Sequence, residues 1–186
     1  MSYYTPERFN NWIERIREVS IDFDRPETLE VFDKMVDDFV VACLNVIRAV
    51  KERELTKKQA IKELENMEKI LMSDVNFEDS EKNDFFEFVR EGLKVVARSA
   101  RYCVEGKVSR KKFENLLKDA LKKEKSGDVE GAFDIVARMG AKVFKGEKLP
   151  EELPVPEDSV IINWIDGIDA INTVMLLMEI DSSSED

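Results

Sequence analysis

Residues 24–53 read DRPETLEVFDKMVDDFVVACLNVIRAVKER, a stretch in which apolar side chains recur every three to four positions. That period places them on one face of an α-helix, and the run is too long for a β-strand. Asp24 is followed three residues later by Glu27, which is the spacing of a capping box at a helix start. We therefore expect a long helix from Asp24 to about Arg53, whose buried face carries Phe32, Met35, Val36, Phe39, Val40, Cys43, Ile47 and Val50.

The rest of the chain repeats this kind of pattern. Glycine (seven residues) and proline (five residues) are scarce, which disfavours a turn-rich β architecture. We predict an all-α fold of about seven helices, packed as a bundle or as a short stack of antiparallel hairpins. Residues 1–180 should form a single domain, and residues 181–186 a flexible acidic tail. The six further helices are expected at residues 5–19, 56–72, 80–105, 109–125, 128–145 and 158–180.

Most of these helices have recognisable start or stop signals. Pro6 follows Thr5 at the first helix, where the missing proline N–H costs nothing. Thr56 and Gln59 have capping-box spacing, and Ser109 is expected to begin the helix that ends near residue 125. Gly106 should end the preceding helix in a left-handed conformation.

A shift of 53 residues aligns the second and third predicted helices with the fourth and fifth. It places Phe32 on Phe85, and it also superposes the two helix starts, Thr56 and Ser109. Either a structural duplication or two unrelated hairpins of similar length would produce this match. In both cases the short turns predict antiparallel pairing within each hairpin.

The densest apolar positions give a predicted core. The two cysteines, Cys43 and Cys103, lie within apolar helical patterns, so we expect buried reduced thiols in preference to a disulfide. The side chains predicted to be largely buried are Trp12, Phe39, Phe86 or Phe88, Trp164 and Ile168.

Charge is unevenly distributed along the chain, whose net charge is -11. Residues 147–186 contain eleven acidic side chains and one basic side chain, whereas residues 107–125 contain eight basic and three acidic ones. The chain is therefore a nearly neutral body with one basic stretch and one strongly acidic end. The net negative charge disfavours general nucleic-acid binding, although the basic stretch could still form a local nucleic-acid-binding surface.

The absence of histidine removes many reaction classes. Ser-His and Cys-His nucleophile pairs cannot form, and two cysteines cannot complete a structural zinc site. No phosphate-binding glycine loop occurs. The run from Asp74 alternates oxygen ligands as a calcium loop does, but Asp79 stands where glycine is needed and Phe85 where a bidentate glutamate is needed. We expect no metal, no cofactor and no enzymatic activity.

Two kinds of charged cluster are candidate binding residues. Lys57 and Lys58 follow one helix start, and a lysine strip follows another, where cations together with free N–H groups favour anions. Asp166 and Asp169 lie one turn apart in an apolar helix. They either form its narrow solvent-exposed face or pair with a lysine or arginine of another helix or another chain. The lysine strip should be exposed, and it should either bind an external anion or be covered by carboxylates of residues 147–158 from its own chain or from a second copy. It comprises Lys111, Lys112, Lys118, Lys122 and Lys123.

Four sequence segments resemble an uncharacterised archaeal protein family, domain of unknown function 2150. They are Tyr4 to Trp12, Asp37 to Leu44, Val75 to Phe77 and Asn163 to Asp169. The similarity covers nearly the full length. It implies an archaeal cytosolic protein, and it brings no activity and no site residues with it.

These observations favour a non-enzymatic interaction protein, an adaptor or scaffold, that binds another protein or a second copy of itself. The alternative is an RNA- or ribosome-associated factor using the lysine strip, and a less favoured one is an enzyme with a carboxylate, arginine and lysine pocket. No DNA binding is expected. The sequence has no signal-peptide pattern, and its most apolar segment is interrupted by Asn163, Asp166 and Asp169. We therefore expect a cytoplasmic location and no membrane span.

Overall fold

The computed structural model describes residues 2–184, with side chains through residue 180. This part of the chain folds into seven α-helices and one short 3-10 helix, and it contains no β-strand, which confirms the all-α prediction. The elements are α1 (Pro6–Glu18), η1 (Pro26–Leu29), α2 (Glu30–Lys51), α3 (Lys57–Leu71), α4 (Ser80–Glu105), α5 (Phe113–Lys125), α6 (Val129–Phe144) and α7 (Ile161–Ser184).

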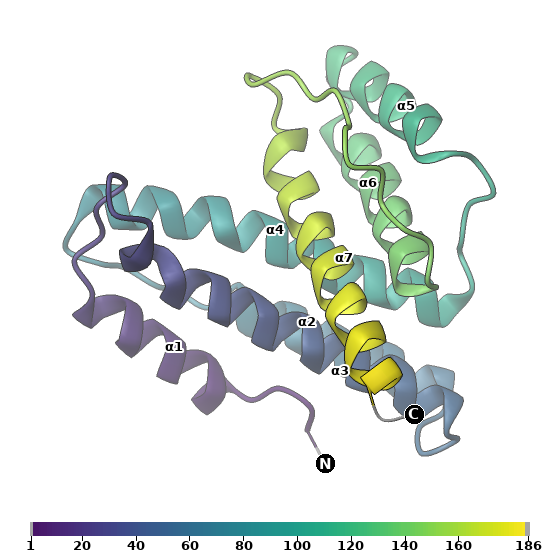
Figure 1. The fold of residues 1–186 in the computed structure, drawn as a ribbon, viewed down its shortest axis with the longest axis horizontal. Coiled ribbons are helices and arrows are strands. Elements are labelled where there is room, and N and C mark those ends of the chain that lie inside the picture. The colour runs from purple at the N-terminus through teal and green to yellow at the C-terminus, as the bar shows by residue number, and fades with distance from the viewer. Residues whose placement is uncertain (1, 185–186) are drawn as a thin grey trace.

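Helix α4 is the centre of the fold. It packs against α2, α3, α6 and α7, and α7 crosses over both α2 and α4 (Figure 1). Helix α1 lies at one edge against α2 and α3, whereas α5 lies at the opposite edge against α6 (Figure 1). Helix α6 thus stands between α5 and α7, and the two edge helices are far from each other in the fold.

Several predicted helix ends are confirmed in detail. The Thr56 hydroxyl accepts a bond from the Gln59 N–H, and the Gln59 side chain accepts one from the Thr56 N–H, which completes the capping box of α3. Helix α4 ends at Gly106, whose φ of 78° is left-handed. Asp128 caps α6 by accepting a bond from the Gly131 N–H at 2.8 Å. In each case a local side-chain or glycine preference decides the boundary.

The predicted capping box between Asp24 and Glu27 is wrong. The chain forms η1 there, with no side-chain cap, and α2 begins later, at Glu30. Thr28 replaces the expected cap: its hydroxyl oxygen accepts a bond from the Asp22 N–H at 2.9 Å and donates towards the Arg25 carbonyl. This local loop competes with the helix for the same backbone groups.

The predicted start of α5 at Ser109 is also wrong, because α5 begins at Phe113. The buried Lys142 of α6 donates a hydrogen bond to the Lys111 carbonyl, and its ammonium lies 4.9 Å from the centre of the Phe113 ring. Lys142 also approaches Glu147 at 3.5 Å. A carbonyl held by Lys142 is not free for a first helical turn, so a tertiary contact overrides the serine cap.

The 53-residue duplication is not confirmed. Helix α2 packs against α3, but α4 and α5 make at most marginal contact, and α5 forms its antiparallel pair with α6 instead. The loop of residues 106–112 carries α5 away from α4 (Figure 1). The predicted pairing of the second hairpin is therefore wrong, although both helices exist.

The predicted core is mostly confirmed. Phe39, Phe86, Trp164 and Ile168 are buried, whereas Trp12 is only half-buried. The Trp164 indole N–H donates to Glu91 at 3.1 Å, so the buried ring keeps a polar partner. Both cysteines are buried free thiols, as expected.

Two glycines allow α7 to approach α4 closely. A β-carbon built on Gly167 would lie 2.4 Å from the Gly92 carbonyl oxygen, so no larger residue fits without moving one helix. A β-carbon on Gly92 would lie 3.3 Å from the Asn163 carbonyl oxygen, a tight contact that needs a much smaller shift. The contact between these two glycines sets the distance between α7 and α4 at their crossing.

Helix α7 has two further properties. By length and composition alone, Ile161–Ile180 is apolar enough to cross a membrane, a test that core helices of soluble proteins also pass, and α7 packs against α2, α4 and α6. The helix continues to Ser184, past the start of the predicted tail at residue 181. The end of that predicted tail, residues 185 and 186, lies outside the described residues.

Candidate functional site

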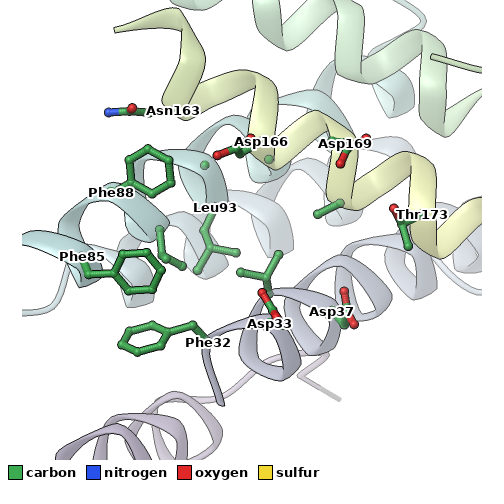
Figure 2. Close-up of a pocket in the computed structure, with 15 residues that line it drawn as sticks. Phe32, Asp33, Asp37, Phe85, Phe88, Leu93, Asn163, Asp166, Asp169 and Thr173 are labelled. Carbon is green, nitrogen blue, oxygen red and sulfur yellow. The ribbon is translucent and has the colours of Figure 1, made fainter. Parts of the chain in front are cut away.

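A cavity of about 480 Å³ opens between α2, α4 and α7. Its floor is apolar, its two long walls carry carboxylates, and Figure 2 shows Asp33 and Asp37 on α2 across from Asp166 and Asp169 on α7. We call it the acidic groove, and its lining residues are Phe32, Asp33, Val36, Asp37, Phe85, Phe88, Val89, Gly92, Leu93, Asn163, Asp166, Gly167, Asp169, Ala170 and Thr173.

Helical spacing explains how the carboxylates line the groove. Asp33 and Asp37 are four residues apart and Asp166 and Asp169 are three apart, so each pair lies on one face of its helix. All four residues are exposed. Among residues 2–180, whose side chains are described, none of them forms a salt bridge, and no lysine or arginine lines the groove. The predicted acidic pair of α7 is therefore half of a four-carboxylate arrangement without a cation.

Three of the four carboxylates are held in an environment unfavourable to charge. Partial burial raises the pKa of Asp166, and the neighbouring Asp169 raises it further. Partial burial also raises the pKa of Asp33, with a contribution from Glu30, and that of Asp37, with a contribution from Asp33. The groove thus concentrates negative charge next to an apolar surface, where a bound cation would lower the electrostatic cost.

One end of the groove is aromatic (Figure 2). The Phe85 ring packs edge-to-face on Phe32, with centroids 4.7 Å apart, and stacks with Phe88 at 6.1 Å. Phe23, which is 54% exposed, extends this surface by an edge contact with Phe85 at 5.7 Å. Phe85 and Phe88 are only partly buried and line the groove, so part of each side chain is accessible from it.

Asp38 shows what a satisfied carboxylate looks like on the same helix. It accepts two bonds from the Arg8 guanidinium, at 2.6 and 2.9 Å, and a third from the Trp12 indole N–H at 2.9 Å. Those contacts attach α1 to α2. Its neighbour Asp37 points to the groove side of α2 and has none of them. The same helix thus carries one aspartate with an arginine partner and, in the groove, two aspartates without one in the described part of the chain.

The structure places the lysine strip on the outer edge of α5. All five predicted lysines are exposed, and three of them, Lys111, Lys118 and Lys122, line a shallow cavity of about 620 Å³ together with Lys125. Lys111 pairs with Asp119 at 2.9 Å, whereas Lys123 turns away to pair with Asp128 at 3.5 Å.

The remaining lysines of this surface form no salt bridge in the described structure, although Lys122 is close enough to Asp119 to help Lys111 lower the pKa of that carboxyl. Among the described residues, no salt bridge involves Lys112, Lys118, Lys122 or Lys125. Cover by residues 147–158 of the same chain is also absent there: the salt bridge of that segment runs from Glu147 to Lys142, which is not part of the strip. Cover by the same residues of a second copy stays a prediction.

Lys57 and Lys58 are not brought to the strip. Both are exposed in the first turn of α3, which packs on α2 and α4, whereas α5 packs on α6. The two basic clusters that the 53-residue shift makes equivalent lie on helices with different neighbours, so the structure gives no single basic surface containing both.

The groove carboxylates do not converge as metal ligands do. Within residues 2–180, no three histidine, cysteine, aspartate or glutamate side chains lie close enough together to hold a metal ion. The two aspartate pairs instead face each other across an apolar floor. This geometry suits an extended cationic surface better than a single ion.

Comparison with known proteins adds a family to these observations. A family described as "Uncharacterized protein conserved in archaea (DUF2150)" matches residues 2–183. The chain belongs to this family. Neither the curated proteins nor the solved structures contain a match to this DUF2150 protein.

Sequence reasoning missed half of the groove of this DUF2150 protein. Asp33 and Asp37 have the same one-turn spacing in an apolar helix as the predicted pair Asp166 and Asp169, and that signal was present in the sequence. What the sequence does not show is that α2 and α7 pack side by side, which brings the two pairs to one groove.

Proposed function

We propose that this DUF2150 protein is a non-enzymatic interaction module whose acidic groove binds a lysine- or arginine-rich segment of another protein chain. The observation that carries the proposal is the combination of an apolar aromatic floor with four carboxylates that have no cation partner among the described residues. An apolar cleft lined by a few charged groups is typical of a binding site.

The chemistry of the groove selects for long basic side chains. A lysine or arginine stem is apolar and can lie on Phe85 and Phe88, while its charged end reaches Asp166 or Asp37. The chain already places cationic groups over aromatic rings internally, since the Lys142 ammonium lies 4.9 Å from the centre of the Phe113 ring and the Arg90 guanidinium 4.9 Å from the centre of the Phe86 ring.

The proposal can be tested with purified full-length protein and a synthetic probe. The probe is a helical peptide with leucine and lysine at helical spacing, and its binding is measured by fluorescence anisotropy. If each ion pair contributes about 0.5 kcal/mol, removing four carboxylates costs about 2 kcal/mol, or more than tenfold in affinity. The groove-neutral variant for this test is D33N/D37N/D166N/D169N.

A matched control separates the groove from overall charge. Residues 151–158 contain four exposed acidic side chains on the connector before α7, so a control variant can remove the same number of charges elsewhere: E151Q/E152Q/E157Q/D158N. The control should bind the probe within about twofold of the original protein. Equal losses in both variants, or no binding to the original protein, would overturn the proposed function.

The lysine strip supports a second candidate function, RNA binding. Its specific observation is the shallow cavity on α5 whose Lys118, Lys122 and Lys125 form no salt bridge in the described part of the chain. Asp119 and the overall negative charge weigh against it. RNA recovered with the purified protein should fall steeply as salt rises. It should disappear in a variant with these lysines changed to glutamate.

A further inference from the structure

We infer that the acidic groove of one molecule receives the lysine-bearing face of α5 from a second copy of the same chain. This inference rests on the proposed function and names the occupant of the groove. The described chain leaves two complementary surfaces unsatisfied: the groove carboxylates, and the lysines Lys118, Lys122 and Lys125.

The two surfaces match in spacing as well as in sign. Lys118 and Lys122 are four residues apart, which is the spacing of Asp33 and Asp37. Lys122 and Lys125 are three apart, which is the spacing of Asp166 and Asp169. Residues at these intervals lie on one face of a helix, so α5 can present its lysines in a row to carboxylates that are arranged in rows of similar length.

The contact must be made between molecules, because the fold keeps the two surfaces apart. Helix α6 stands between α5 and α7 (Figure 1). In the described chain, α6 is the only helix with which α5 packs extensively. Within one molecule the lysines cannot reach the groove without unfolding the α5–α6 pair.

The floor of the groove can also be covered by this occupant. The large apolar side chains Phe113, Leu116 and Leu117 are buried against the body, so the outer face of α5 carries mainly lysines, together with Asn115, Asp119 and the half-buried Leu121. Lysine stems are apolar enough to lie on Phe85 and Phe88. The contact is therefore expected to be charge-dominated, weak and salt-sensitive.

The contact joins two different surfaces, a groove on one copy and a helix face on the other. Two copies can each dock α5 in the groove of the other to give a dimer, or each copy can bind the next to give short open chains. Both arrangements raise the measured mass above the 21.5 kDa of one chain as concentration rises.

A charge-swap experiment on the full chain tests the inference by sedimentation velocity at about 50 mM and about 500 mM salt. The groove variant is D37K/D166K/D169K, and the strip variant, which includes the adjacent Lys125, is K118E/K122E/K125E. The original protein should self-associate at low salt and dissociate at high salt. Each variant alone should be monomeric, because its two surfaces now have the same sign. An equimolar mixture should associate again, because each groove then meets a strip of opposite sign.

A third variant controls for net charge. K57E/K58E/K62E reverses three exposed lysines of α3 that form no salt bridge in the described structure, and it has the same net charge as the strip variant. It should self-associate like the original protein, with a dissociation constant within about threefold, and the strip variant should weaken association at least about tenfold. If circular dichroism shows that a reversal variant is unfolded, the corresponding Lys→Gln or Asp→Asn variant replaces it and should also be monomeric.

The outcomes distinguish the two proposals. Association that the charge swap does not restore, or an original protein that stays monomeric at low salt, overturns the inference. If the protein is monomeric but the groove still binds the basic probe peptide, the occupant is a basic helix of another protein and the proposed function stands. If the protein is monomeric and the strip variant loses bound RNA, the strip is a nucleic-acid surface and the inference is wrong.

Discussion

Substituting alanine for Gly167 is expected to strain the crossing on which the acidic groove depends. The added β-carbon would lie 2.4 Å from the Gly92 carbonyl oxygen and 2.9 Å from the Gly92 carbonyl carbon. These are backbone atoms of α4, so they cannot rotate away as a side chain does, and α7 must rise by roughly 1 Å to restore ordinary contact distances. The same alanine at Gly92 meets its nearest atom at 3.3 Å and needs a shift of only a few tenths of an ångström.

The two substitutions therefore have different expected costs. Overpacking against rigid neighbours costs about 1–3 kcal/mol, and for Gly167 the upper end applies because backbone obstructs the new atom. Alanine regains about 1 kcal/mol of helix propensity over glycine at either position. Gly167→Ala should then destabilise the protein by about 2 kcal/mol, which for a domain of this size lowers Tm by about 4–8 °C. Gly92→Ala should be neutral within about 0.5 kcal/mol.

Urea denaturation of both variants measures the difference, and the basic probe peptide connects it to the groove. Lifting α7 moves Asp166 and Asp169 away from α2, so folded Gly167→Ala protein should also bind the probe several-fold more weakly. A Gly167→Ala variant as stable as the original protein, or a Gly92→Ala variant that costs as much, would refute the reasoning that backbone contact at this crossing sets the position of α7.

Four further predictions concern the core, the α1–α2 contact, the groove and the two cysteines. Trp164→Ala should cost roughly 3–5 kcal/mol in the free energy of unfolding, because the ring is buried, and an unchanged melting temperature would contradict its place in the core. Asp38→Asn should cost roughly 1–2 kcal/mol through the weakened contacts to α1. Asp37→Asn should cost nothing at pH 7. The pKa of Asp37 is raised in the folded state, so the ionised carboxylate lowers stability as pH rises, and any gain from Asn should vanish in acid, where the carboxyl is protonated. Urea denaturation at pH 7 and in acid measures the difference. Burial raises the pKa of the Cys43 and Cys103 thiols, so iodoacetamide at pH 8 should modify them only after unfolding, and rapid labelling of native protein, seen by mass spectrometry, would contradict their burial.

Local sequence signals were sufficient for the helices and for most of their ends. The capping box of Thr56 and the left-handed Gly106 depend on nearest-neighbour chemistry, which a sequence displays directly. The failure at Ser109 has a different cause: Lys142, thirty-three residues away in the sequence, holds the Lys111 carbonyl, and a periodicity argument has no access to such a contact.

The candidate site was predictable in its parts and not in its assembly. The exposure of the lysine strip and the unusual placement of Asp166 and Asp169 follow from helical period and composition. Their meaning depends on which helices are neighbours. That α7 lies beside α2 while α5 lies beyond α6 is decided by long-range packing, including the contact of Gly92 with Gly167. One amphipathic helix can satisfy many such arrangements, so the sequence alone does not select among them.

The central claim is that the acidic groove is where this protein contacts its partner, and a photo-crosslink from inside the groove tests it most directly. The photoreactive residue p-benzoylphenylalanine replaces Phe88 in the full chain, with Met72, exposed on another part of the surface, as the control site. Irradiation in native cells, followed by mass spectrometry of the adducts, should show crosslinks from position 88 to a lysine- or arginine-rich segment. Adducts that fall on residues 107–125 of a second copy would identify α5 as that segment. Crosslinks no more frequent or more basic at position 88 than at position 72 would contradict the account.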